Sequence, residues 1–139
     1  MRRVIVAVAL MLAVASTAFA KTPKLAPVYK CTGSEDGEHY AVWLAVEQRD
    51  RAVRFHQIAE NGAATGIAYG FLTDNTLSVT LWFSSGNFGT ALYKVKGKKL
   101  VGEWQVVGAT AIAPESCEVA DSFPKPTVSD HTDSERVGL

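Results

Sequence analysis

Apolar and polar residues alternate along most of the chain from residue 28 to residue 120, and turn-forming residues interrupt the alternation. A two-residue period places successive side chains on opposite faces of a strand, so each run predicts a half-buried β-strand. No segment of this region has the 3.6-residue period of an amphipathic helix. The expected strands are Val28–Gly33, Tyr40–Gln48, Ala52–Ile58, Gly66–Leu72, Leu77–Phe83, two in the hairpin Gly89–Val106, and Ser116–Ala120.

Short strands that follow one another without helices predict an antiparallel meander. A meander of this many strands avoids exposed edges by closing on itself. We therefore expect an all-β domain, an eight-stranded antiparallel up-and-down small β-barrel of the lipocalin or avidin kind. The interior of such a barrel is either filled by side chains or holds one small ligand.

Aromatic residues dominate the predicted inner face. Simple alternation directs Trp43 and Trp82 outward, and it directs seven other aromatic residues inward: Tyr40, Phe55, Tyr69, Phe71, Phe83, Tyr93 and Trp104. The inner aromatics fill the core on one reading, with Trp104 the largest of them and Gly102 making room nearby. On the other reading they line a small apolar pocket, and the candidate ligand-binding residues are then Tyr69, Tyr93 and Trp104.

Two surface features are candidates for contact with a partner. The aromatic residues around the turn after the fifth strand predict an exposed patch, whose candidate residues are Trp82, Ser85, Gly86 and Phe88. The lysine-rich turn at residues 96–99 is either a solvated hairpin tip or a contact for an acidic partner.

The two ends of the chain differ from the strand region. Residues 1–20 combine a basic start, a short apolar run and an Ala-Phe-Ala cleavage pattern, which together predict a signal peptide. The mature chain then begins at Lys21, and residues 21–120 form the barrel domain with no membrane span. Residues 121–139 are rich in Ser, Thr, Asp and Pro, which predicts a disordered tail. We expect a periplasmic or secreted protein.

Charge and cysteine content fit this location. The mature chain has 12 basic and 14 acidic residues, so its composition indicates no nucleic-acid partner. The two cysteines, Cys31 and Cys117, fall in the first and last predicted strands. Two cysteines in an exported chain normally pair, so we predict a disulfide between them. Neighbouring first and last strands are also what closure of the barrel requires.

No motif of catalysis or cofactor binding is present. The histidines His39, His56 and His131 lack ligand spacing, so we expect no metal and no cofactor. The segment Ser84–Gly86 lacks the pattern of a nucleophile elbow. Surface positions account for the carboxylates Glu47, Glu103 and Glu118. These observations predict a protein that is not an enzyme.

The order of turn glycines and core aromatics resembles a family of small exported bacterial proteins, largely uncharacterised and loosely labelled fibronectin-binding. The resemblance extends from Tyr29 to about Glu118, and it supports the fold more than any activity. Its motifs are Tyr29-x-Cys31-x-Gly33, Asp36-Gly37, Tyr40, Gly66-x-x-x-Gly70, Leu77-x-Val79, Tyr93-x-Val95 and Leu100-x-Gly102-x-Trp104.

The Tyr-x-Cys opening and the late cysteine are also similar to the exported inhibitors of C-type lysozyme. Those inhibitors present a Ser-Gly-x-x-Tyr loop, whereas this chain has Ser85-Gly86-Asn87-Phe88-Gly89. The sequence as a whole predicts a non-enzymatic exported barrel that binds a small ligand or an exported or extracellular protein. The alternative is a periplasmic protein similar to the lysozyme inhibitors.

Overall fold

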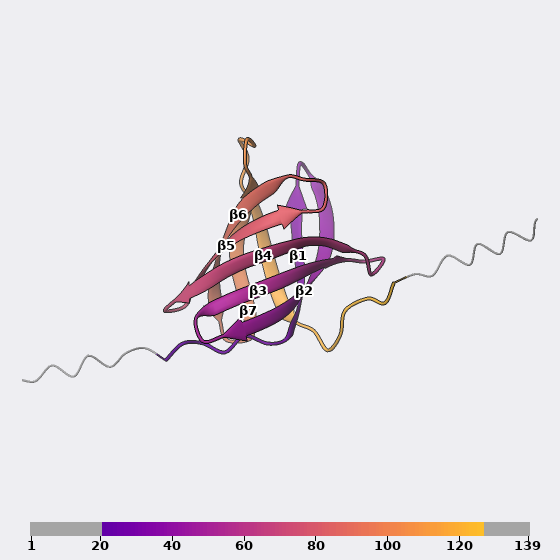
Figure 1. Cartoon of the computed structure of the whole chain (residues 1–139). Coiled ribbons are helices and arrows are strands. Elements are labelled where there is room, and N and C mark those ends of the chain that lie inside the picture. The colour runs from indigo at the N-terminus through magenta and orange to yellow at the C-terminus, as the bar shows by residue number, and fades with distance from the viewer. Residues whose placement is uncertain (1–20, 127–139) are drawn as a thin grey trace, which may run out of the picture.

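The computed structural model describes residues 21–126, which form a closed antiparallel β-barrel (Figure 1). The predicted signal peptide, residues 1–20, and residues 127–139 of the predicted tail lie outside the described residues. No helix in the described part of the chain is long and apolar enough to cross a membrane. The strands are β1 Val28–Glu35, β2 Glu38–Arg49, β3 Ala52–Ala59, β4 Ala64–Thr73, β5 Thr76–Phe83, β6 Phe88–Lys96, β7 Lys99–Val106 and β8 Ala113–Val119.

Each strand pairs with the next, and β8 returns to pair with β1. Tight turns make this possible. At the β1–β2 turn Asp36 and Gly37 both have positive φ, at 49° and 82°, as a two-residue type I′ hairpin turn requires. The predicted eight-stranded antiparallel barrel is confirmed.

A disulfide joins the strands that close the barrel. Cys31 and Cys117 are directly opposite each other in the β1–β8 pair, and their sulfur atoms are bonded at 2.03 Å. Both residues are fully buried. The predicted pairing is therefore confirmed, and a buried disulfide is typical of proteins in an oxidising, exported environment.

The two ends of the barrel differ. The N-terminal segment covers one end, at the bottom of Figure 1, where Leu25 is buried and its backbone N–H donates to Gln48 Oε1 at 2.8 Å. Leu72, Leu77 and Leu100 fill the interior next to it, each no more than 1% exposed. The β1–β2 turn and the β7–β8 loop lie at the opposite end, towards the top of Figure 1. The interior of the barrel is thus filled by side chains at the end that the N-terminal segment covers.

Strand β4 faces the other way from the prediction. Tyr69 and Phe71, predicted to point inward, are 49% and 53% exposed on the outer face. The buried residues of β4 are instead Ala68 and Leu72. The register explains this, because Ala68 is opposite Phe55 of β3 and Leu81 of β5, and cross-strand partners share a face. Small side chains on β4 leave room for the larger inner residues of its two neighbours.

Residues 121–126 follow β8 without regular secondary structure. The backbone of Lys125 and Pro126 passes so close to Gly62, in the β3–β4 turn, that a β-carbon at Gly62 would overlap it. Gly62 also has a φ of 80°, which L-residues rarely adopt. The start of the predicted tail therefore lies against the barrel.

Candidate functional site

A cavity of about 230 Å³ occupies the end of the barrel opposite the N-terminal segment. Exposed Glu35 is among its lining residues, so the cavity reaches the surface at this end. Most of the wall is aliphatic or aromatic, and the polar groups are few. The lining residues are Glu35, Tyr40, Val42, Leu44, Phe55, Gln57, Ile67, Ala68, Val79, Leu81, Phe83, Tyr93, Trp104 and Glu115.

Five residues form one lateral row across the wall of this cavity. In order across β2, β1, β8, β7 and β6, the register places Tyr40 opposite Gly33, Gly33 opposite Glu115, Glu115 opposite Gly102, and Gly102 opposite Tyr93. A β-carbon at Gly33 would overlap the Tyr40 hydroxyl, and one at Gly102 would lie 2.8 Å from Tyr93 Cδ1. The two glycines therefore let both tyrosine rings lean across the sheet towards Glu115.

Both tyrosines donate hydrogen bonds to the central carboxylate. The Tyr93 hydroxyl is 2.6 Å from Glu115 Oε1, and the Tyr40 hydroxyl is 2.8 Å from Glu115 Oε2. Glu115 is the buried charged residue of the described chain, at 8% exposed. A buried carboxylate is tolerated only when its oxygen atoms accept hydrogen bonds, and each of these oxygens accepts one.

Trp104 extends the network and gives it a direction. Its indole Nε1–H donates to the Tyr40 hydroxyl at 2.6 Å, so the Tyr40 oxygen acts as acceptor there and its own proton is directed at Glu115. The rings of Tyr40 and Trp104 meet edge to face, with centroids 6.1 Å apart. The ring of Phe83 also packs against Trp104, in a tilted arrangement with centroids 6.1 Å apart. Every side-chain donor of this network thus points, directly or through Tyr40, to Glu115.

Burial changes the acidity of these groups. Desolvation raises the pKa of Glu115 above its ordinary value, and the hydrogen bonds from Tyr93 and Tyr40 oppose that effect. Desolvation also raises the pKa of Tyr93 and of Tyr40, and the nearby Glu115 charge adds to both shifts. The tyrosines are therefore fixed as proton donors, and Glu115 is the acceptor of the network, with a pKa above its ordinary value.

This raised pKa predicts a pH-dependent stability. Above 4.5, the ordinary pKa of a glutamic acid, the unfolded chain releases the Glu115 proton while the folded protein still holds it. The contribution of Glu115 to the free energy of unfolding is then complete below that pH and is lost as the pH rises through the folded pKa. The measurement is urea unfolding of the native protein and of Glu115→Gln from pH 4 to about pH 8. We expect the free energy of unfolding of the native protein, relative to that of the variant, to fall as the pH rises.

The comparison with Glu115→Gln isolates this one carboxyl group, because every other titratable group is common to the two proteins. The groups that face Glu115 are Tyr40, Tyr93 and, through Tyr40, Glu35. A relative stability that rises with pH over this interval would mean that the folded protein lowers the Glu115 pKa, and would contradict the prediction.

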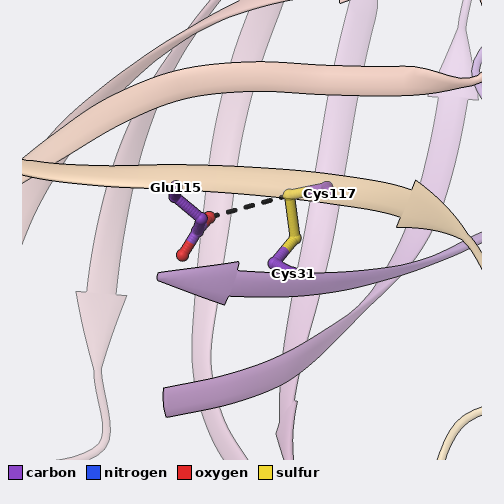
Figure 2. Close-up of side chains that lie close together, drawn as sticks. All are labelled: Cys31, Glu115 and Cys117. Carbon is purple, nitrogen blue, oxygen red and sulfur yellow. Dashed lines mark hydrogen bonds between the residues drawn. A yellow bond between two sulfur atoms is a disulfide. The ribbon is translucent and has the colours of Figure 1, made fainter. Parts of the chain in front are cut away.

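Glu115 also lies beside the disulfide, as Figure 2 shows. Its Oε1 atom is 3.7 Å from the Cys117 sulfur, but a disulfide sulfur carries no proton and does not donate to the carboxylate. Cys31, Cys117 and Glu115 bring three potential ligand atoms within 4.8 Å of one another. Metal binding by cysteine requires thiolates, and both sulfurs are bonded to each other, so this cluster does not make a metal site.

The outer face carries a second, shallower depression of about 420 Å³ over β4–β7. Its lining includes Tyr69, Phe71 and Leu92, all about half exposed. Tyr69 pairs edge to face with Trp82, with ring centroids 6.0 Å apart. Polar residues such as Thr80 complete the lining, so the depression is a surface groove of mixed character.

The predicted site residues divide between these two places. Tyr93 and Trp104 line the inner cavity, whereas Tyr69 is on the outer face and does not reach it. The predicted partner-binding residues lie at the β5–β6 end of the outer face. Trp82 and Phe88 are directly paired and about half exposed, and Ser85 and Gly86 are exposed in the turn between them.

Sequence reasoning missed Glu115, the central residue of the cavity. A signal for it exists in β8, because Glu115 is two residues before Cys117 and therefore on the same face of the strand. An inward cysteine places Glu115 inward as well. The glutamates that were assigned to the surface, Glu47, Glu103 and Glu118, are all exposed.

The barrel and its cavity define a class of architecture, the small closed antiparallel barrel with one accessible end. No family model matches the chain, and neither a curated protein nor a solved structure matches it significantly.

Proposed function

We propose that this protein is a non-enzymatic binding protein that holds one small, largely apolar ligand in the cavity at the accessible end of the barrel. The observation that carries the proposal is the cavity itself, an apolar chamber with a single buried polar cluster at Glu115. Small-molecule sites have this composition, because apolar walls supply affinity and a few fixed polar groups orient the ligand.

The packing of the barrel supports this use of the space. The end near Leu25 is filled by leucines, whereas at the other end the inner residue of β4 is Ala68, where a larger side chain would enter the cavity. A volume of about 230 Å³ is below the roughly 300–1,000 Å³ of sites for drug-sized molecules. The ligand is accordingly small, about the size of one substituted ring.

We further place this function in the periplasm or outside the cell. The disulfide and the signal-peptide pattern of residues 1–20 support export. A carrier or sensor of small molecules would meet its ligand there.

The test uses a neutral probe, 3-phenylpropan-1-ol, titrated into the disulfide-bonded protein by isothermal calorimetry. We expect saturable binding of one probe per barrel. Ala68→Leu places three extra carbon atoms in the cavity and should abolish binding, while Ala64→Leu, an exposed position on the same strand, should leave it unchanged.

Two results would overturn the proposal. One is the absence of saturable binding of any probe with this hydrocarbon skeleton, charged or neutral, by the native protein. The other is equal binding by Ala68→Leu and the native protein with circular dichroism of both intact, because the probe would then occupy a site outside the barrel. Native mass spectrometry of protein purified from its own source would, in addition, identify a retained ligand.

A second candidate function is protein binding at the β5–β6 end. It is favoured by the adjacent, half-exposed aromatic pair Trp82 and Phe88 beside the exposed Ser85-Gly86 turn, because large exposed aromatics are common in protein interfaces. The similarity to lysozyme inhibitors makes C-type lysozyme the first partner to test. A turbidity assay with bacterial cell walls decides this candidate, and unchanged lysis at a molar excess of the protein would reject inhibition.

A further inference from the structure

We propose that the ligand carries a protonated amine, which enters the cavity as the counter-ion of Glu115. This inference rests on the proposed function, since it names the chemical class of the ligand for the same cavity. It follows from three independent features of the site, namely the direction of its hydrogen bonds, the sign of its charge and the aromatic character of its wall.

The hydrogen bonds of the cluster leave acceptors for a ligand. The Trp104 N–H is engaged with Tyr40, and the Tyr40 and Tyr93 hydroxyl protons are engaged with Glu115. Each carboxylate oxygen has accepted one bond from these donors and keeps a second acceptor position. The amide of Gln57 is the remaining donor-bearing side chain of the lining. A ligand group that donates therefore fits this cluster, whereas one that accepts does not.

Apart from the tyrosines, the ionisable groups of the cavity wall are both carboxyl groups, so any charge that they carry is negative. The lining contains two carboxylates, Glu115 inside and Glu35 at the accessible end, and it includes no lysine, arginine or histidine among the described residues. A low-dielectric cavity with charge of one sign attracts ligands of the opposite sign. Anionic ligands such as fatty acids would be repelled by the same two groups.

Aromatic residues form the part of the cavity wall near Glu115. Tyr40 and Phe83 both pack against Trp104, and Tyr93 is on the far side of Glu115 in the same lateral row. Aromatic side chains stabilise ammonium groups through their π-electrons, and desolvated sites strengthen this contact. A charged hydrogen-bond acceptor within an aromatic wall is thus suited to an alkylammonium group.

Burial makes the ionised form of Glu115 costly, as the raised pKa of this carboxyl group reflects. An ammonium group that pairs with the carboxylate stabilises that ionised form. A bound ammonium loses its own hydration and gains the ion pair, two hydrogen-bond acceptors that are already oriented, and the apolar contacts of its hydrocarbon part. A preformed site of this kind favours the amine over a neutral ligand of equal size.

The test compares three probes with one hydrocarbon skeleton, 3-phenylpropylamine, 3-phenylpropan-1-ol and 3-phenylpropanoate, by calorimetry at about pH 7.5, where the amine is charged. We expect the native protein to bind the amine about tenfold or more tightly than the alcohol, and the carboxylate most weakly. In Glu115→Gln the amine and alcohol should bind with dissociation constants within about threefold of each other. Glu103→Gln, which removes an exposed carboxylate from the outer face of β7, should keep the native preference.

The outcomes separate this inference from the proposed function. If the alcohol binds in the cavity as tightly as the amine does, the amine inference is wrong and the binding function stands. The same conclusion follows if Glu115→Gln keeps the preference for the amine. If no probe binds, both proposals fail. Should Glu115→Gln not fold, the comparison of the three probes with the native protein still decides the inference.

Discussion

Replacing both cysteines, as Cys31→Ala with Cys117→Ala, is expected to lower the free energy of unfolding by about 4–5 kcal/mol. The disulfide joins residues 86 apart in sequence, so it encloses nearly the whole barrel. A cross-link over so long a loop removes much of the conformational entropy of the unfolded chain. It also holds β1 against β8, the one strand pair whose members are far apart in sequence. Urea unfolding followed by circular dichroism measures the change.

The matched control for the cysteine variant is Thr32→Ala with Ser116→Ala. These two residues are also directly paired between β1 and β8, on the outer face, and no covalent bond joins them. We expect this variant to stay within about 1 kcal/mol of the native protein. Equal urea midpoints for the cysteine variant and the native protein would show that strand pairing alone closes the barrel. Chemical reduction is a weaker test, because both sulfurs are fully buried and a reagent reaches them only after the barrel opens.

Phe55→Ala is expected to cost about 3–5 kcal/mol, the usual range for removing a fully buried aromatic side chain. Phe55 is 2% exposed, belongs to the core cluster and also forms part of the cavity wall. Its removal takes apolar contacts from Ala68 and from Val46, its partners on β4 and β2. The same urea experiment measures this loss.

Phe71→Ala provides the comparison, because it removes the same side chain from the neighbouring strand. Phe71 is 53% exposed on the outer face, so its loss should change stability by only about 0.5 kcal/mol. The pair of variants tests the orientation of β4. Equal costs, or a larger cost for Phe71→Ala, would show that Tyr69 and Phe71 point inward as simple alternation predicts.

The β4 error has a clear physical origin. Alternation divides a strand into two faces but does not say which face is inside, and the more apolar set is the natural choice. In β4 the larger residues Tyr69 and Phe71 are outside, and the inner set contains Gly70 and Ala68. The space inside a small barrel is limited, and Phe55 of β3 and Leu81 of β5, the partners of Ala68, already take up the room that two more large rings would need. Which face of β4 points inward therefore depends on the combined volume of the side chains on the neighbouring strands.

In the candidate site too, some residues could be predicted from the alternation of their own strands and one could not. Tyr93 and Trp104 could be predicted as inner residues because their own strands alternate cleanly, with polar Lys94 and Glu103 on the other side. Glu115 could not be recognised in this way, because a carboxylate at an inner position contradicts the hydrophobic pattern. Its burial depends on two tyrosine hydroxyls that come from β2 and β6.

The sequence by itself determined the strands, their antiparallel order and the closing disulfide, because these follow from local alternation, from short turns and from two cysteines at the ends of the domain. Only the tertiary structure decided the face of β4 and the cluster around Glu115. Both depend on lateral register between strands, which joins Tyr40, Gly33, Glu115, Gly102 and Tyr93 in one row. These residues come from positions 33 to 115, and no local pattern relates them, because the pairing of β1 with β8 that closes the barrel joins the Tyr40 and Gly33 half of the row to the Glu115, Gly102 and Tyr93 half.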